Sequence, residues 1–412
     1  MNGRTMLNVP LACASLLSLA LTLWQWCVAR RFPIHQRAGD PQFAPPVTLL
    51  KPLKGADAET FACLESWLNQ DYSGPVQVLV GVASEEDPAC ALARRVIAAH
   101  PHRDARLIIC CECLGANGKV STMIQLQRAA KHDVLIVSDA DVFVPRDFLA
   151  NVVLPLREPE SGLVTCLYRL ANPSTTAMQW EAIAMNADFW TQVLQARSLR
   201  PLDFALGAVM ATTRKRLEAV GGFDALADYL ADDYQLGHRI ARQGGSVELS
   251  PVVVDCRESA KGWREVWAHQ LRWARTIRVC KPLPYFCSIL GNATLWPLLW
   301  FLAELPGMAR SFRIAPNDFT GDLTAVSTAV PVALPIALVC LLARMVTALH
   351  NHSRLTRGSS HLAFWWLVPL KDLAETIIWA LAFLGSGIEW RGRRYRVTRG
   401  GRLASLHHAG TE

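Results

Sequence analysis

The sequence predicts an α/β protein with a mainly parallel sheet flanked by helices, one transmembrane helix before it and membrane helices after it. Strand-like apolar runs alternate with helical stretches between residues 47 and 138. Residues 6–29 carry no charge, and three more apolar segments lie near 285–306, 323–349 and 361–388. Such alternation favours β-α-β units on a parallel sheet, and an uncharged run of this length can span a bilayer.

The composition agrees with a membrane protein that carries a water-soluble domain. Apolar residues make up 51% of the 412 residues and charged residues only 19%, with a formal charge of +7. These values exclude a disordered chain, a collagen and a small disulfide scaffold. Lysine and arginine are spread out without basic–aromatic alternation, so we expect no nucleic-acid partner.

The first apolar run is predicted to be an uncleaved transmembrane anchor, residues 1–30. A signal peptide is the alternative, but its apolar core is shorter and ends in small residues. This run ends at Trp24 and Trp26, and Arg30 and Arg31 follow. Boundary tryptophans followed by arginines are typical of a membrane helix whose next residues stay in the cytoplasm. Residues 31–283 are therefore expected to form a cytoplasmic domain.

Each element of this domain follows from its local pattern, because short apolar β-branched runs predict strands and longer stretches between them predict helices. The predicted order is strand 47–50, helix 58–68, strand 76–82, helix 88–99, strand 106–110, helix 120–130 and strand 134–138. Ligands bind at the carboxyl ends of such strands. No G-x-G-x-x-G or Walker A loop follows a strand, which disfavours a dinucleotide-binding or P-loop fold.

Two pairs of carboxylates are candidates for chemistry. Asp139 and Asp141 form a D-x-D at a strand end, where they can hold Mg²⁺ or Mn²⁺ against a diphosphate; a polar strand end that caps the next turn is the alternative. Asp232 and Asp233 open a helical stretch. Helix capping explains one of them. Adjacent acids in a partly closed site can instead raise one pKa and supply a general base.

A basic and aromatic stretch precedes the C-terminal apolar segments. His269, Arg272 and Trp273 lie within it, and Arg275 and Arg278 follow. Arginine beside tryptophan can bind a diphosphate and stack on an acceptor. An amphipathic basic helix on the membrane surface is the equally weighted alternative.

The region 284–390 is predicted to hold membrane and interfacial helices. Charges in its first and last apolar segments, such as Glu304 and Lys371, are costly at mid-membrane depth. The basic tail, 391–412, belongs in the cytoplasm, and three full crossings would put it outside. We therefore expect two crossings plus one interfacial helix.

Taken in order, these pieces resemble glycosyltransferase family twenty-one, the ceramide glucosyltransferase type, and most closely the bacterial hopanoid-biosynthesis glycosyltransferases. The resemblance covers nearly the whole chain, and only the ordered set of motifs is specific. The matching stretches are LLKPLKGAD at 49–57, EDPA at 86–89, GANGKV at 115–120, SDAD at 138–141, GGF at 221–223, DDY at 232–234, LRW at 271–273 and WRGRRYR at 390–396.

The resemblance implies a GT-A-type fold and a set of site residues. The family pattern is three aspartates followed by a (Q/R)-x-x-R-W box. Asp87 matches the first aspartate, expected at the nucleotide, and Lys119 lies in the matching G-x-N-x-K segment, expected at the donor. Asp139 matches the second aspartate, and Asp141 completes a metal-binding D-x-D. Asp233 matches the third, the expected catalytic base.

Arg272 and Trp273 match the last two positions of the box. The first position departs from the pattern, because His269 stands where the family has Gln or Arg. A histidine can still donate a hydrogen bond. Gln270 could replace the missing residue only through a register shift.

The implied activity is an inverting transfer from a UDP-sugar to a hydroxyl of a membrane lipid, with a divalent cation, Mg²⁺ or Mn²⁺. The expected location is the bacterial inner membrane, multi-pass, with the catalytic domain in the cytoplasm. N-acetylglucosamine and a hopanoid polyol are the first expectation, and ceramide or diacylglycerol with glucose the second. A processive polysaccharide synthase would need more spans after Trp273. A non-enzymatic membrane scaffold is disfavoured by the carboxylate set.

Overall fold

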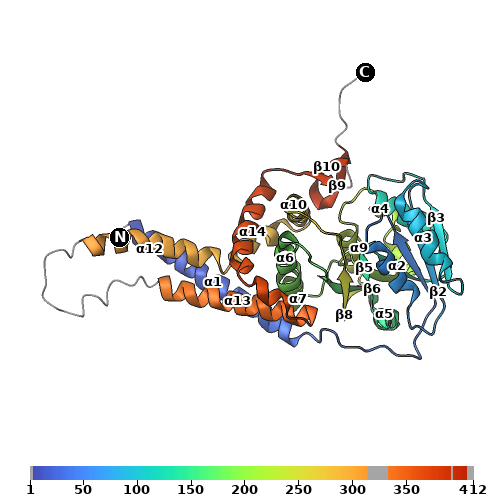
Figure 1. Cartoon of the computed structure of the whole chain (residues 1–412), viewed down its shortest axis with the longest axis horizontal. Coiled ribbons are helices and arrows are strands. Elements are labelled where there is room, and N and C mark those ends of the chain that lie inside the picture. The colour runs from blue at the N-terminus through green and yellow to red at the C-terminus, as the bar shows by residue number, and fades with distance from the viewer. Residues whose placement is uncertain (1–2, 314–332, 391–392, 406–412) are drawn as a thin grey trace, which may run out of the picture.

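The computed structural model describes residues 3–313, 333–390 and 393–405, and Figure 1 shows an α/β domain from which long helices extend. The central sheet has eight strands in the order β3-β2-β1-β4-β7-β6-β8-β5. They are β1 (Val47–Pro52), β2 (Val76–Val82), β3 (Asp104–Ile109), β4 (Val134–Ser138), β5 (Val142–Phe143), β6 (Ser161–Leu170), β7 (Val209–Thr213) and β8 (Ser246–Cys256).

Strands β1 to β4 are parallel, so their carboxyl ends lie at one edge of the sheet. Val47 of β1 pairs with Val76 of β2 on one side and with Val134 of β4 on the other. Strand β8 is parallel to β6 and ends at the same edge, while β7 runs antiparallel between β4 and β6. Continuous burial of β1 and β4 is typical of strands covered on both faces. The predicted mainly parallel α/β sheet is confirmed.

The three predicted helices between the first strands are present as α2 (Thr60–Leu68), α3 (Pro88–Ala98) and α4 (Gly118–Arg128). Side chains of Asp87 and Asn117 cap α3 and α4, which fixes both helix starts at the carboxyl edge of the sheet. The other helices of the domain are α5 (Phe148–Val153), α6 (Thr176–Ile183), α7 (Trp190–Leu199), α8 (Arg214–Ala219), α9 (Asp232–Arg242) and α10 (Trp263–Cys280).

Helices α1 (Gly3–Arg31), α12 (Leu295–Arg313) and α13 (Ala333–Thr356) pack against one another and extend away from the sheet (Figure 1). Among the described residues, two stretches are long and apolar enough to cross a membrane, Asn8–Arg31 and Ala333–Thr356. A third candidate joins Pro282–Gly291, which includes α11 (Pro282–Ser288), to the first part of α12, with a bend of 53°. Residues 323–332 of the predicted second segment lie outside the described residues.

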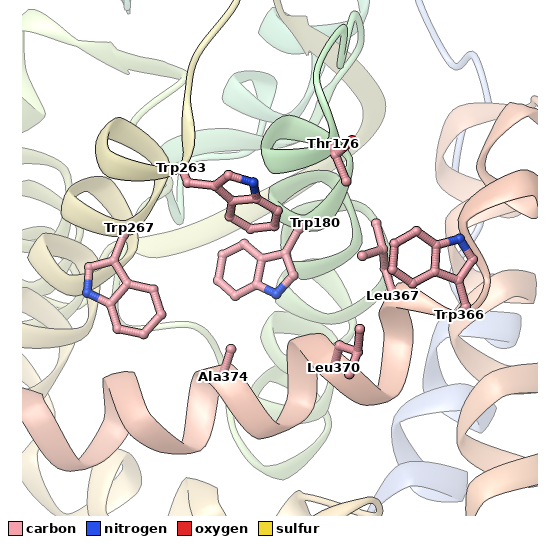
Figure 2. A pocket seen from close by; sticks show the side chains of 8 residues that line it. All are labelled: Thr176, Trp180, Trp263, Trp267, Trp366, Leu367, Leu370 and Ala374. Carbon is pink, nitrogen blue, oxygen red and sulfur yellow. The ribbon is translucent and has the colours of Figure 1, made fainter.

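Helix α14 (Leu367–Phe383) runs across the ends of the long helices rather than along them (Figure 1). It packs against α10 and α6 of the α/β domain. Tryptophans gather where these three elements meet, as Figure 2 shows. The last apolar segment therefore joins the long helices to the sheet domain, and the length and composition of α14 do not meet the requirements for a span.

The charges of this segment are neutralised by an ionic network. Arg344, midway along α13, donates hydrogen bonds to both carboxylate oxygens of Asp188 at 2.8 Å and to Asp372 at 2.8 and 2.9 Å. Lys371 also bonds Asp188, and it bonds Glu375 at 2.7 Å. Buried charges persist only when paired in this way, so the network explains the polar residues in an apolar sequence.

A second, antiparallel sheet of three strands, β9 (Gly387–Trp390), β10 (Arg393–Val397) and β11 (Leu403–Ser405), follows α14. The predicted boundary at residue 390 therefore divides one sheet. Backbone hydrogen bonds attach this sheet to the loop before α9: Leu230 N–H donates to Gly401 at 2.8 Å, and Leu403 N–H donates to Asp228 at 2.7 Å. Residues 393–405 are thus a folded wall of the α/β domain rather than a loose tail.

Candidate active site

Lys119 joins the two predicted carboxylate motifs. Its ammonium lies 2.8 Å from Asp139 Oδ1 and 3.0 Å from Asp232 Oδ2. The side chains of Lys119 and Asp232 are only 8% and 7% exposed. Burial would lower the pKa of Lys119, but the two carboxylates outweigh it and raise the pKa. This lysine is therefore a fixed positive charge that connects the end of β4 to the start of α9.

Asp233 is next to this ion pair and is half-buried. Burial and the negative charge of Asp232 raise the pKa of Asp233 to about 7, against the opposing charge of Lys119. The N-cap position is Ala231, and no side chain caps it. The Asp233 carboxylate does accept a hydrogen bond from the Tyr234 N–H of the first turn at 2.7 Å, so a helix-start role stands beside the expected role of a base. A carboxylate with a pKa near neutrality is matched to the task of a general base.

Gly207 contacts the Asp233 carboxylate, and pattern reasoning missed it. A Cβ at this glycine would lie 2.9 Å from Asp233 Oδ2. The next residue, Ala208, accepts a hydrogen bond from the Asp139 N–H at 3.1 Å. Thr165 of β6 holds this loop through its hydroxyl, which donates to Leu206 O at 2.9 Å. The loop before β7 thus contacts both Asp139 and Asp233 and holds them at a fixed distance from each other. The small residue at position 207 is the only sequence signal for this contact.

The two carboxylates that follow β4 are the residues that could hold a divalent cation. Asp139 and Asp141 present hard carboxylate oxygens, which Mg²⁺ and Mn²⁺ prefer. Burial, together with the negative charges of Asp139 and Glu258, raises the pKa of Asp141 to about 7. An added cation would favour its ionised form. The donor type therefore fits such an ion, although Lys119 already contacts Asp139 Oδ1 at 2.8 Å.

Lys51 supports the same strand end and was also missed as a functional residue. This fully buried side chain on β1 donates to Ser138 Oγ at 3.1 Å and to the Asp139 carbonyl. Burial lowers the pKa of Lys51 to about 8. Its sequence signals were its place directly after the predicted strand 47–50 and within the family-matching stretch at 49–57. Through the Lys51 side chain, β1 thus holds the backbone of the D-x-D at Asp139 in place.

Asp87 lies at the same edge of the sheet but has structural partners. Its carboxylate accepts from Gly55 N–H at 2.9 Å and from Ala89 N–H at 2.9 Å. It therefore holds the loop after β1 against the start of α3. Asn117 has an equivalent role, because its amide donates to Tyr229 O at 2.6 Å. The contacts of the described residues do not join Asp87 to the Lys119 ion pair, and a nucleotide role for Asp87 stays a prediction.

His269 of α10 is bound to a buried carboxylate that the sequence did not reveal. Its Nδ1 lies 2.5 Å from Glu181 Oε1 of α6, and Gln270 donates to the same oxygen at 2.9 Å. Glu181 is 0% exposed. Burial would raise its pKa, but hydrogen bonds from His269 and Gln270 lower it. His269, the residue that departs from the family box, thus has a hydrogen-bond partner in Glu181, which lies 88 residues away in sequence.

Trp273 packs between His269, at a ring distance of 4.8 Å, and Phe189, at 5.7 Å. Arg272 and His269 line a charged pocket of about 270 Å³ together with Glu258. The negative charge of Glu258 also helps to raise the pKa of Asp141. Near the end of α10, Arg275 donates to the carbonyl of Gly387, the first residue of β9, and Arg278 donates to the carbonyl of Gly385. The two arginines thus attach the start of β9, whose last residues line the charged pocket, to α10.

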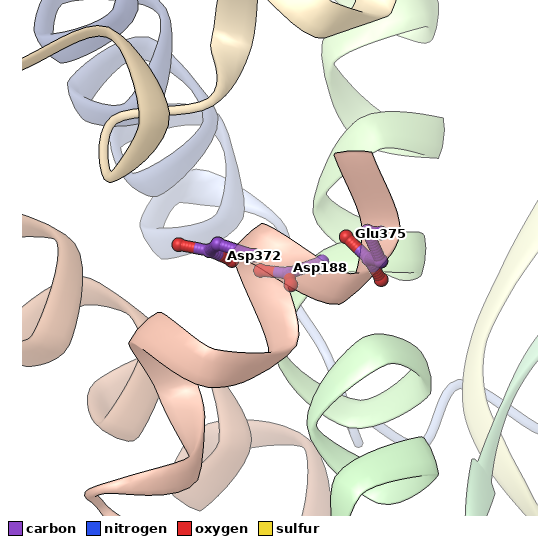
Figure 3. Close-up of side chains that lie close together, drawn as sticks. All are labelled: Asp188, Asp372 and Glu375. Atoms are coloured by element: carbon purple, nitrogen blue, oxygen red, sulfur yellow. The ribbon is translucent and has the colours of Figure 1, made fainter. Parts of the chain in front are cut away.

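The acidic residues shown in Figure 3 are a different cluster. Asp188, Asp372 and Glu375 offer oxygens within 4.8 Å of one another, the one such group found among the described residues. Arg344 and Lys371 already contact these oxygens at ion-pair distance. Two cations thus take the place that a metal would need, and we assign the cluster to the ionic network.

Comparison with solved structures identifies the class of fold. A mannosyltransferase from Pyrobaculum calidifontis, solved with GDP-Man and Mn²⁺, matches with a TM-score of 0.51 and 22% identity, covering 90% of this chain and 99% of its own. The likeness confirms the predicted GT-A-type fold.

The chain belongs to glycosyl transferase family 21, whose family model matches residues 10–403. Ceramide glucosyltransferase 1 of Caenorhabditis elegans is 24% identical over 220 residues, which are 53% of this chain and 47% of that protein. An N-acetylglucosaminyltransferase of Bradyrhizobium diazoefficiens is 25% identical over 292 residues, 65% of this chain and 58% of its own. The matched part thus spans about half the length of these curated relatives. The predicted membership of this glycosyltransferase family is confirmed.

Proposed function

We propose that the protein transfers N-acetylglucosamine from UDP-N-acetylglucosamine to a hydroxyl of bacteriohopanetetrol, with inversion, at the cytoplasmic face of a bacterial inner membrane. The observation that carries this proposal is the Lys119 ion pair, which holds the D-x-D of β4 beside the half-buried Asp233. The Bradyrhizobium relative supports the choice of sugar.

In this proposal Asp233 accepts the proton of the acceptor hydroxyl while that oxygen attacks the anomeric carbon from the face opposite the diphosphate. The reaction is a single displacement, so no sugar is attached to the enzyme. Arg272 donates to the diphosphate and stabilises its charge as it leaves. Asp139 and Asp141 would hold a divalent cation, which supplies Lewis-acid stabilisation of the leaving group when bound.

The arrangement of α14 supports a lipid acceptor. This helix packs on α10, which carries the box residues, and its other neighbours are the candidate span α13 and the bent candidate's helix α12. An amphiphilic acceptor leaves a bilayer at a high cost in free energy, and a site held against the membrane surface avoids that cost. Interfacial placement of α14 is part of the proposal.

Replacing Asp139 by Asn tests the metal role. We expect Asp139→Asn to weaken donor binding in the presence of Mn²⁺ by roughly tenfold or more, because the variant removes an anionic ligand. Isothermal titration with UDP-N-acetylglucosamine, with and without Mn²⁺, measures the effect. Asp133→Asn, an exposed aspartate before β4, is the matched control. If Mn²⁺ strengthened donor binding equally in both variants, Asp139 would be excluded as a metal ligand.

The function itself is tested by a transfer assay on membranes that carry the protein. Labelled UDP-N-acetylglucosamine and UDP-glucose are each offered with bacteriohopanetetrol, ceramide or diacylglycerol, with and without a chelator. A chelator-sensitive N-acetylglucosaminyl hopanoid is expected. Glucosylceramide or a glucosyl diacylglycerol would keep the mechanism and change the substrates. Long polymer would indicate a processive synthase, and absence of any transfer would contradict the proposal.

A further inference from the structure

An apolar hollow of about 250 Å³ lies between α6, α10 and α14, on the side of α10 away from the charged pocket. Figure 2 shows four tryptophans around it: Trp180 from α6, Trp263 and Trp267 from α10, and Trp366 at the start of α14. Leu370 of α14 completes the wall between them. Trp180 and Trp263 meet edge to face at 6.3 Å. The hollow is thus a built aromatic site and not a single exposed ring.

The hollow and the charged pocket share two helices. On α10, Trp263 and Trp267 are four residues apart and face the hollow, whereas His269 lines the charged pocket. On α6, Trp180 faces the hollow, and the next residue, Glu181, bonds His269. A molecule seated against the tryptophans therefore lies one helix away from the residues expected to act on it.

The walls of the hollow are open to an apolar surface. Trp263 is 53% exposed, Trp366 44% and Leu370 51%. The same helix exposes Ile377 by 54%, so an apolar strip continues along α14, which also contacts α12 and α13. Contiguous exposed apolar surface of this kind marks a ligand or membrane contact. The volume is below that of a complete small-molecule site, so the hollow suits part of a larger apolar molecule.

We propose that this four-tryptophan hollow binds the hydrocarbon body of the lipid acceptor, while its hydroxylated end reaches the charged pocket at His269 and Arg272. The inference rests on the proposed function, in which the acceptor is a membrane lipid. Flat indole faces offer large apolar contact at low entropic cost. The site would therefore select acceptors by their apolar part, separately from donor recognition at the carboxylates.

The test uses the purified full chain in detergent micelles with two probes, diazirine-labelled bacteriohopanetetrol and diazirine-labelled ceramide. We expect light-induced labelling of peptides that contain Trp267 or Leu370. Variants Trp263→Ala and Trp366→Ala should reduce that labelling and raise the KM for the acceptor roughly tenfold, with the KM for the donor unchanged. Trp365→Ala is the matched control, because this tryptophan is 50% exposed, adjacent in sequence and outside the hollow.

The outcomes separate this inference from the proposed function. Transfer to a lipid with no difference between Trp366→Ala and Trp365→Ala would overturn the hollow as a site and leave the function standing, since both rings would then only contact the bilayer. Labelling spread over the long helices would also overturn it. Labelling confined to the hollow without any sugar transfer would support the lipid site and contradict the activity.

Discussion

Replacement of Asp233 by Asn is expected to lower the rate of sugar transfer by about 10²–10⁴-fold, the usual contribution of a general base. The amide has the same shape but cannot accept the proton of the acceptor hydroxyl. Lys119 would keep its ion pairs with Asp139 and Asp232, so the fold and the donor site should survive. Rates measured with both substrates saturating, beside a titration with UDP-N-acetylglucosamine, test this directly.

Asp224→Asn is the matched control, since Asp224 is exposed on the segment that precedes the same helix. It should retain wild-type turnover and donor affinity. In the wild type, kcat/KM should fall as the pH drops through about 7, because the raised pKa of Asp233 leaves it protonated below that value. If Asp233→Asn kept most of its turnover, another group would have to be the base.

Replacement of Arg344 by Met is expected to destabilise the folded protein by about 3–5 kcal/mol, the cost of removing one partner from a buried ion pair. The guanidinium is the shared partner of Asp188 and Asp372, and neither carboxylate would be fully compensated by Lys371 alone. Thermal unfolding of the purified chain in detergent, followed by circular dichroism, measures the loss.

Arg354→Met on the same helix is the comparison variant. Its guanidinium donates to the Phe32 carbonyl at 3.2 Å and is half-buried, so a loss of about 1 kcal/mol is expected. Similar melting temperatures for both variants would mean that the network around Arg344 adds little to stability.

The elements of the sheet domain could be predicted because their signals are local. The strand at 76–82 and the helix that Asp87 caps show the expected periodicity, and both are present at nearly the predicted bounds. Asp139 and Asp233 were singled out because carboxylates at strand ends and helix starts are conspicuous. Their roles remain predictions, but the structure does bring the two motifs together through Lys119.

The contacts that complete the site could not be predicted, since they join residues far apart in sequence. Nothing in the local pattern pairs Glu181 with His269, or places Gly207 against Asp233. The C-terminal strands were hidden for another reason. Arginines dominate residues 390–396, and they mask the alternation of buried side chains at Tyr395 and Val397.

The small sheet also has a consequence for how the protein is made. Residues 399–403 hold the loop that carries Leu230, and Gln235 of α9 donates to Gly400. These residues follow α12 and α13 in the chain, so they leave the ribosome after both helices. A nascent chain that ends before residue 399 therefore lacks the contacts that hold Leu230 and Gln235, which flank Asp233 in sequence. We expect the enzyme to gain activity only after residues 399–403 have been synthesised and have folded onto this loop.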